Sequence, residues 1–187
     1  MAGSSKERVA VYFDGSNTYN KLKKFGLPEK TKRFDFSALA THMTGERELI
    51  SKRYYVGIVR NHDHSEKSET LVRKQQQFLE TLRAAGFEIK KGKIMYDGGR
   101  IREKGVDVKL AIDLVIGAAD DLYDTAIVVS SDTDLIPAIK YARFKKKNVE
   151  YVGFAGEPSF GMIRECSSQR LFAKEDLLPF QYLKPEE

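Results

Sequence analysis

The sequence predicts an α/β protein whose central sheet is mainly parallel. Short runs rich in β-branched and aromatic residues alternate with longer stretches of helical character, which is typical of strand–helix–strand crossover units. The run at residues 125–130 is apolar almost throughout, as expected for a strand of a parallel sheet that is covered on both faces. The 187 residues are enough for one domain with a sizeable core.

Each element is predicted from its composition and from the residues that end it. The first strand stops at Asp14-Gly15, and the long charged helix stops at Gly86, a typical C-terminal signal. Strands are expected at residues 8–13, 52–59, 125–130 and 149–154, with an extended segment at 87–95 that Gly92 interrupts and a closing edge at 171–172 and 177–178. Helices are expected at residues 18–25, 34–43, 65–85, 106–119, 135–147 and 159–166.

The secondary structure of two neighbouring segments is less obvious from their residues. Residues 96–105 are rich in glycine and basic side chains, so we expect a loop there. Residues 106–119 alternate as a strand would, but their length and three alanines favour a helix, which we expect to be mostly buried. The sequence thus predicts one domain over residues 8–183, with a flexible N-terminus at 1–7 and a short tail at 184–187.

Composition excludes several classes of protein. Hydrophobic residues make up 41% and charged residues 32%, which excludes a disordered chain, a collagen and a membrane-spanning bundle. The single cysteine, Cys166, rules out an intrachain disulfide framework and favours a reducing, cytoplasmic setting. We expect no membrane partner and no secretory signal, since no long apolar segment is present. The net charge of +5 permits a nucleic-acid partner.

Aspartates follow two of the predicted strands directly. Asp14 follows the first strand, and Asp132 and Asp134 follow the strand at 125–130. Ligands of an open parallel sheet bind beyond the carboxyl ends of its strands, so these acids meet on one rim if the two strands are neighbours. Carboxylates gathered in this way repel one another unless a proton or a divalent cation neutralises them. Oxygen ligands select Mg²⁺ or Mn²⁺, and no histidine–cysteine spacing suits zinc.

Asp107 is a fourth candidate, at the start of the helix at 106–119. It either complements the helix dipole or serves as a metal ligand from across the cleft. Asp113 lies six residues further on, rotated by roughly 120°, so we expect it to hold a second ion or to orient water. Asp134 has its own alternative as a cap of the following helix, where Pro137 suits the first turn.

Polar side chains extend both strand ends. Ser16 and Asn17 follow Asp14 and could orient a metal-bound water or a phosphate, or else cap the next helix. Ser130 and Thr133 add hydroxyl groups beside the aspartates that follow the other strand. We therefore count these four residues as supporting members of the site.

Basic residues are expected around the same edge of the sheet. Arg60 follows the second strand, and Arg102 and Lys104 precede Asp107, so we expect all three to bind phosphates of the substrate. Tyr12, Phe13 and Tyr19 could stack on a base, although the first two are better explained as core residues.

Three motifs together resemble the NYN domains, a branch of the PIN-like nucleases that includes LabA-like proteins. They are Asp14-Gly15-Ser16-Asn17, then Lys104-Gly105-Val106-Asp107-Val108 with Leu110, Ala111 and Asp113, then Ser130-Ser131-Asp132-Thr133-Asp134-Leu135-Ile136-Pro137. The resemblance spans roughly residues 8–178. It implies a PIN-like three-layer α/β/α sandwich and metal-dependent RNA cleavage, with Asp14, Asp107, Asp132 and Asp134 as the acidic, metal-binding centre.

These observations lead to the expectation of a Mg²⁺- or Mn²⁺-dependent ribonuclease that cuts single-stranded RNA internally. A homodimer is left open. The alternative is a catalytically silent module that binds RNA or a protein partner in a regulatory role. A phosphatase that works through a phosphoaspartate fits less well, because such enzymes usually carry a second aspartate two residues after the first, where this chain has Ser16.

Overall fold

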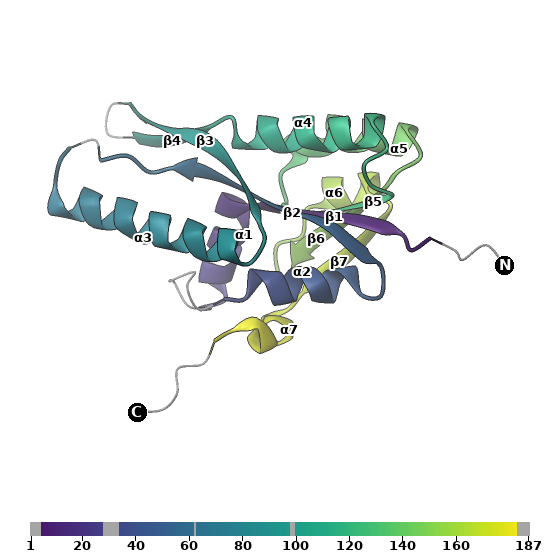
Figure 1. Ribbon diagram of the computed structural model, residues 1–187, viewed down its shortest axis with the longest axis horizontal. Helices are drawn as coiled ribbons and strands as arrows, with labels where there is room; N and C mark the ends of the chain where they lie inside the picture. The colour runs from purple at the N-terminus through teal and green to yellow at the C-terminus, as the bar shows by residue number, and fades with distance from the viewer. Residues whose placement is uncertain (1–4, 28–33, 62, 98–99, 183–187) are drawn as a thin grey trace.

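A seven-stranded sheet forms the centre of the protein in the computed structural model (Figure 1), which describes residues 5–27, 34–61, 63–97 and 100–182. Its strand order is β4-β3-β2-β1-β5-β6-β7, and β4 alone runs antiparallel, to β3. The strands are β1 (Arg8–Asp14), β2 (Glu48–Ile58), β3 (Glu88–Asp97), β4 (Arg100–Lys104), β5 (Thr125–Val129), β6 (Asn148–Phe154) and β7 (Ser168–Phe172).

Helices cover both faces of the sheet, which confirms the expected three layers. The helices are α1 (Gly15–Lys24), α2 (Phe36–Thr44), α3 (Glu66–Ala84), α4 (Val106–Ala119), α5 (Ile136–Phe144), α6 (Phe160–Glu165) and α7 (Lys174–Leu177), with short 3₁₀ turns η2 (Thr133–Leu135) and η3 (Leu178–Phe180). Residues of α1, α2 and α3 pack with Val9, Val11 and Phe13, whereas those of α4, α5 and α6 pack with Ala10 and Tyr12 on the other face. Successive residues of β1 thus alternate between two hydrophobic cores on opposite faces of the sheet, because side chains of a strand point to its two faces in turn.

Most elements lie where the sequence predicts them, with shifted ends. Helix α1 begins at Gly15, three residues earlier than expected, because Asp14 caps it. Asp35 caps α2 and Ser65 caps α3 in the same way. Strand β2 starts at Glu48, and the helix expected at 135–147 consists of η2 followed by α5. Of the predicted N-terminus and tail, residues 1–4 and 184–187 lie outside the described ranges.

The expected loop at 96–105 was wrong, because β4 occupies its second half and pairs with β3. The prediction that Gly92 interrupts the preceding strand was also wrong. A Cβ at Gly92 would lie 2.4 Å from Cγ2 of Val106 and 2.9 Å from the Lys104 carbonyl oxygen. The glycine lets the start of α4 sit directly on β3, and the strand continues through it.

Helix α4 is less buried than predicted. Leu110 and Leu114 are fully buried, but Val108, Ile112 and Ile116 are about half exposed. The helix is apolar on both sides, and the sheet covers only one of them. In the described part of the chain, no helix has both the length and the apolar character that crossing a membrane requires.

Candidate metal centre

The two strand ends that carry the aspartates are neighbours. Strand β1 pairs with β5, with Phe13 opposite Val129, so Asp14 and Ser130 leave the sheet side by side. Asp14 is buried, and its two carboxylate oxygens are used separately. The Asn17 N–H donates to Oδ1 at 3.0 Å, which caps α1, and the Ser130 hydroxyl donates to Oδ2 at 2.8 Å. The predicted meeting of these strand ends is therefore correct.

A short chain of hydrogen bonds runs from Asp14 to the loop after β5. The Ser130 Oγ that donates to Asp14 also accepts the backbone N–H of Asp132, at 3.2 Å. Beside it, the backbone N–H of Ser131 donates to Oδ1 of Asn17, again at 3.2 Å. Asp14 and Asn17 thereby fix the conformation of the loop that carries Asp132.

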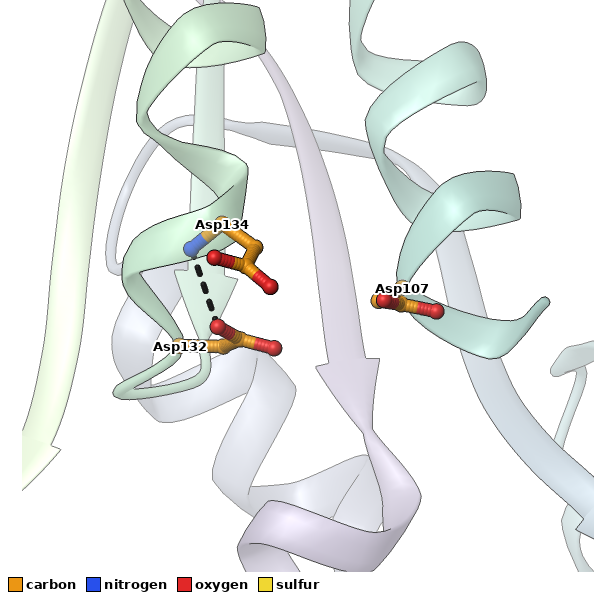
Figure 2. Close-up of side chains that lie close together, drawn as sticks. All are labelled: Asp107, Asp132 and Asp134. Carbon is orange, nitrogen blue, oxygen red and sulfur yellow. Dashed lines mark hydrogen bonds between the residues drawn. The ribbon is translucent and has the colours of Figure 1, made fainter. Parts of the chain in front are cut away.

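Three carboxylates meet at this edge, as Figure 2 shows. One oxygen from each of Asp107, Asp132 and Asp134 lies within 4.8 Å of the others. Asp132 caps η2, with its Oδ1 accepting the Asp134 N–H at 2.9 Å, and its second oxygen points toward Asp107. Asp107 comes from the first turn of α4, across a gap from the other two. Two separate strand–helix units therefore supply the group.

The donor set suits a hard divalent cation. All three side chains offer carboxylate oxygens, which Mg²⁺ and Mn²⁺ prefer over nitrogen or sulfur ligands. Asp107 and Asp132 are half-buried and Asp134 is exposed, so a bound ion would be open to solvent and substrate on one side. Three negative groups so close together favour a cation, because each carboxylate destabilises the charge of the others.

Asp14 and Asp113 are not members of this group. Asp14 lies next to it and acts on it through Ser130. Asp113, expected to hold a second ion or to orient water, is turned away instead. Its Oδ2 accepts the Tyr55 hydroxyl at 2.7 Å and lies 3.4 Å from Arg53 and 3.5 Å from Lys90. Burial and this hydrogen bond raise the pKa of Tyr55, so the phenol stays protonated as a donor. Its rotation by roughly 120° from Asp107 on α4 places Asp113 over β2 and β3.

The remaining predicted residues have varied positions. Ser16 lies in the first turn of α1, and Thr133 begins η2 between the two aspartates. Lys104 is exposed at the end of β4, and Arg60 is exposed beyond β2. The side chain of Arg102 lies outside the described part of the structure.

Three further residues bear on the expectations about cations and aromatic rings. Lys93 stands directly opposite Lys104 in the β3–β4 register. Because like charges in this position destabilise a strand pair, a phosphate near them would be stabilising. Tyr12 and Phe13 are core residues, as expected.

The sequence reasoning missed a groove between α4 and α5. Its volume is about 610 Å³, and Asp107 and Asp134 lie among its lining residues, so it adjoins the acidic group. The signal was present in the sequence: Val108, Ile112 and Ile116 recur every four residues on a different side of the helix from Leu110 and Leu114. The prediction of a mostly buried helix left this second apolar side without a role.

Comparisons with known proteins bear on the family and the fold. The model of the NYN domain family matches residues 8–171. The structure is similar to that of VPA0982 from Vibrio parahaemolyticus, a protein of unknown function, with a TM-score of 0.69 and 24% identity over 92% of this chain and 96% of that one. This likeness shows the fold alone. No curated protein matches the sequence.

A second solved structure is a T5 5′-exonuclease with divalent metal ions (zinc) bound. Its TM-score is 0.39 and its identity 16%, over 70% of this chain and 52% of that one.

Proposed function

This chain belongs to the NYN domain family, a family of nucleases, and from that premise we propose that it is a metal-dependent ribonuclease that cuts single-stranded RNA internally. The observation that carries the proposal is the group of three carboxylates from two separate strand–helix units, with oxygens within 4.8 Å of one another. The group lies beyond the carboxyl ends of parallel strands, where ligands of such sheets bind.

Asp107, Asp132 and Asp134 would hold the ion, which we propose to be Mg²⁺ or Mn²⁺. A divalent cation held there would polarise a phosphate oxygen and lower the pKa of a water molecule. Asp14 is the positioning residue: it holds Ser130, which in turn holds the backbone of Asp132. Asn17 holds Ser131 in the same loop. Because the chain's own groups make these bonds, the carboxylates would need little reorganisation to take up the ion and the phosphate.

Substrate binding is assigned to the three cations that the sequence predicts for this role. Lys104 ends β4 three residues before Asp107 and faces Lys93 across the strand pair. We propose that Lys104, with Arg102 and Arg60, contacts phosphates that flank the scissile bond. Each contact would add to the salt dependence of RNA binding, because each phosphate that is neutralised releases counterions.

The test is cleavage of an end-labelled single-stranded RNA with Mn²⁺, Mg²⁺ or EDTA, combined with calorimetric titration of Mn²⁺ into the protein. Asp134→Asn is the preferred variant, because Asp134 is exposed and its change carries little folding risk. Asp120→Asn, an exposed aspartate at the opposite end of α4, is the matched control. We expect internal cleavage that needs the metal, and loss of cleavage and Mn²⁺ binding in Asp134→Asn alone.

Each other outcome has a definite meaning. Cleavage that persists in EDTA, or in a folded Asp134→Asn protein, contradicts the assigned centre. Metal binding and RNA binding without any cleavage of several RNAs would contradict the nuclease and support a regulatory RNA-binding module instead.

A further inference from the structure

Helices α4 and α5 present a continuous apolar face to solvent. Val108, Ile112 and Ile116 of α4 are 55%, 50% and 46% exposed, and Phe144 of α5 is 80% exposed. Tyr141 lies beside Phe144, with ring centroids 6.5 Å apart, and is also exposed. These five residues define the α4–α5 face. Exposed apolar patches of this kind in a folded protein mark interaction surfaces.

The chemistry of the groove in this face selects against nucleic acid. Apolar side chains of α4 and α5 line most of it, and its charged members are Asp107 and Asp134, with no cation among the described lining residues. Beyond these two aspartates, a phosphate backbone lying along the groove would meet only valine, alanine, isoleucine, proline and tyrosine side chains, with no lysine or arginine to neutralise it. An apolar protein surface suits the groove better, because it removes the exposed valine and isoleucine side chains from water.

The apolar residues of α4 are spaced symmetrically. Val108 and Ile116 each stand four residues from Ile112, or about 6 Å along the helix axis. If two copies of α4 pack antiparallel across a two-fold axis at Ile112, that residue meets its own counterpart and each Val108 meets an Ile116. Such self-complementarity is what an isologous dimer interface requires.

The charges at the two ends of the face also complement each other under this rotation. Asp107 and Asp134 stand at the end where α4 and α5 begin. Lys145 and Lys146 are exposed just beyond the end of α5. Asp120 and Asp121 follow α4 at the same end, and Asp121 is already paired with Arg8 and Lys147. An antiparallel pairing brings Asp107 and Asp134 of each copy toward Lys145 and Lys146 of the other.

We propose that the α4–α5 face is the interface of a symmetric homodimer, with Ile112 at the two-fold axis. This inference does not depend on the nuclease assignment, since it uses neither metal nor RNA. If both hold, Lys145 and Lys146 of each copy would stand near the acidic group of the other.

The first test is the mass in solution, measured by sedimentation velocity at micromolar concentration in EDTA without RNA. We expect twice the chain mass of 21.3 kDa for the natural sequence and a single chain mass for Ile112→Asp. A carboxylate buried in the interface should raise the dissociation constant roughly 100-fold. Leu71→Asp is the control, because Leu71 is 49% exposed on α3, on the opposite face of the sheet. It should stay dimeric. Circular dichroism melts show whether Ile112→Asp is folded.

The second test is crosslinking of Ile112→Cys with a mild oxidant. Two such thiols at a two-fold axis should form one disulfide and a covalent dimer, whereas Leu71→Cys should remain uncrosslinked. The natural Cys166 gives little background, because it is buried and burial raises the pKa of its thiol to about 12.

A monomeric natural protein overturns the proposal, as does a dimer that Ile112→Asp leaves intact or an Ile112→Cys protein that does not crosslink. If the natural protein is monomeric and Ile112→Asp weakens binding of labelled RNA, the face is an RNA surface and the dimer is refuted.

Discussion

Replacing Asp14 with asparagine should destabilise the protein by about 2 kcal/mol, mostly at one hydrogen bond. The amide oxygen can still accept the Asn17 N–H, since asparagine caps helices as well as aspartate does. The amide nitrogen, however, would face the Ser130 hydroxyl, which now donates to the carboxylate at 2.8 Å. Ser130 Oγ already accepts the Asp132 N–H, so its own proton would be left without an acceptor in a buried site.

The same contacts predict the loss of stability in variants at Asp14 and Ser130. Asp14→Ala removes the cap as well, which adds about 1 kcal/mol and makes a total near 3 kcal/mol. Ser130→Ala leaves a buried carboxylate oxygen without its hydroxyl donor, at a similar cost of about 2 kcal/mol. Asp14 and Ser130 share one hydrogen bond. The double variant Asp14→Ala/Ser130→Ala should therefore lose less unfolding free energy than the two single variants together, with a coupling energy of about 1–2 kcal/mol.

Urea unfolding followed by circular dichroism measures the free energy of unfolding of the natural protein and the four variants. The slope of that free energy with urea concentration checks that unfolding stays two-state. Mn²⁺ titration should show weaker binding in Asp14→Asn, with Asp107 and Asp134 intact, because the backbone of Asp132 is less well held. Additive losses of unfolding free energy would refute the positioning role. A stable Asp14→Asn protein that no longer binds Mn²⁺ would also refute it and make Asp14 a direct ligand.

Two further changes test the surroundings of the site. Gly92→Ala places a methyl group 2.4 Å from Val106 and 2.9 Å from the Lys104 carbonyl oxygen, so it should cost about 1–3 kcal/mol and weaken Mn²⁺ binding by displacing Asp107. Adding Val106→Ala should restore part of both losses, and no restoration would show that the contact is not responsible. The hydrogen bond from Arg8 lowers the pKa of Asp124 to about 2, from a usual value of 3.8. The stability that this hydrogen bond contributes is therefore present above pH 3.8 and lost as the pH falls through about 2. Asp124→Asn should have a lower free energy of unfolding than the natural protein near neutral pH, and the two values should converge in acid. A difference that grows on acidification would contradict this reasoning.

The sequence predicted the parts of the fold that local patterns determine. Strands β1 and β5 are nearly continuous apolar runs, and a buried parallel strand has few other interpretations. The strand-end aspartates followed from these two strands, because the carboxyl ends of parallel strands meet at one edge. Strand β4 was missed, since its basic sequence carries no apolar alternation and its pairing with β3 is a tertiary fact. Gly92 was misinterpreted as a break because only the position of Val106 explains it.

The acidic group itself shows where local reasoning ends. Asp132 and Asp134 are held by bonds within their own loop, and the spacing of the motif was enough to place them together. Asp107 joins them only because α4 begins at a particular point on β3, where Gly92 admits Val106 and Leu110 enters the core. The sequence could name Asp107 and Asp113 as candidates on one helix, but the direction of that helix over the sheet decides between them. The same direction turns Val108, Ile112 and Ile116 outward, so the placement of α4 determines both the third carboxylate and the exposed apolar face.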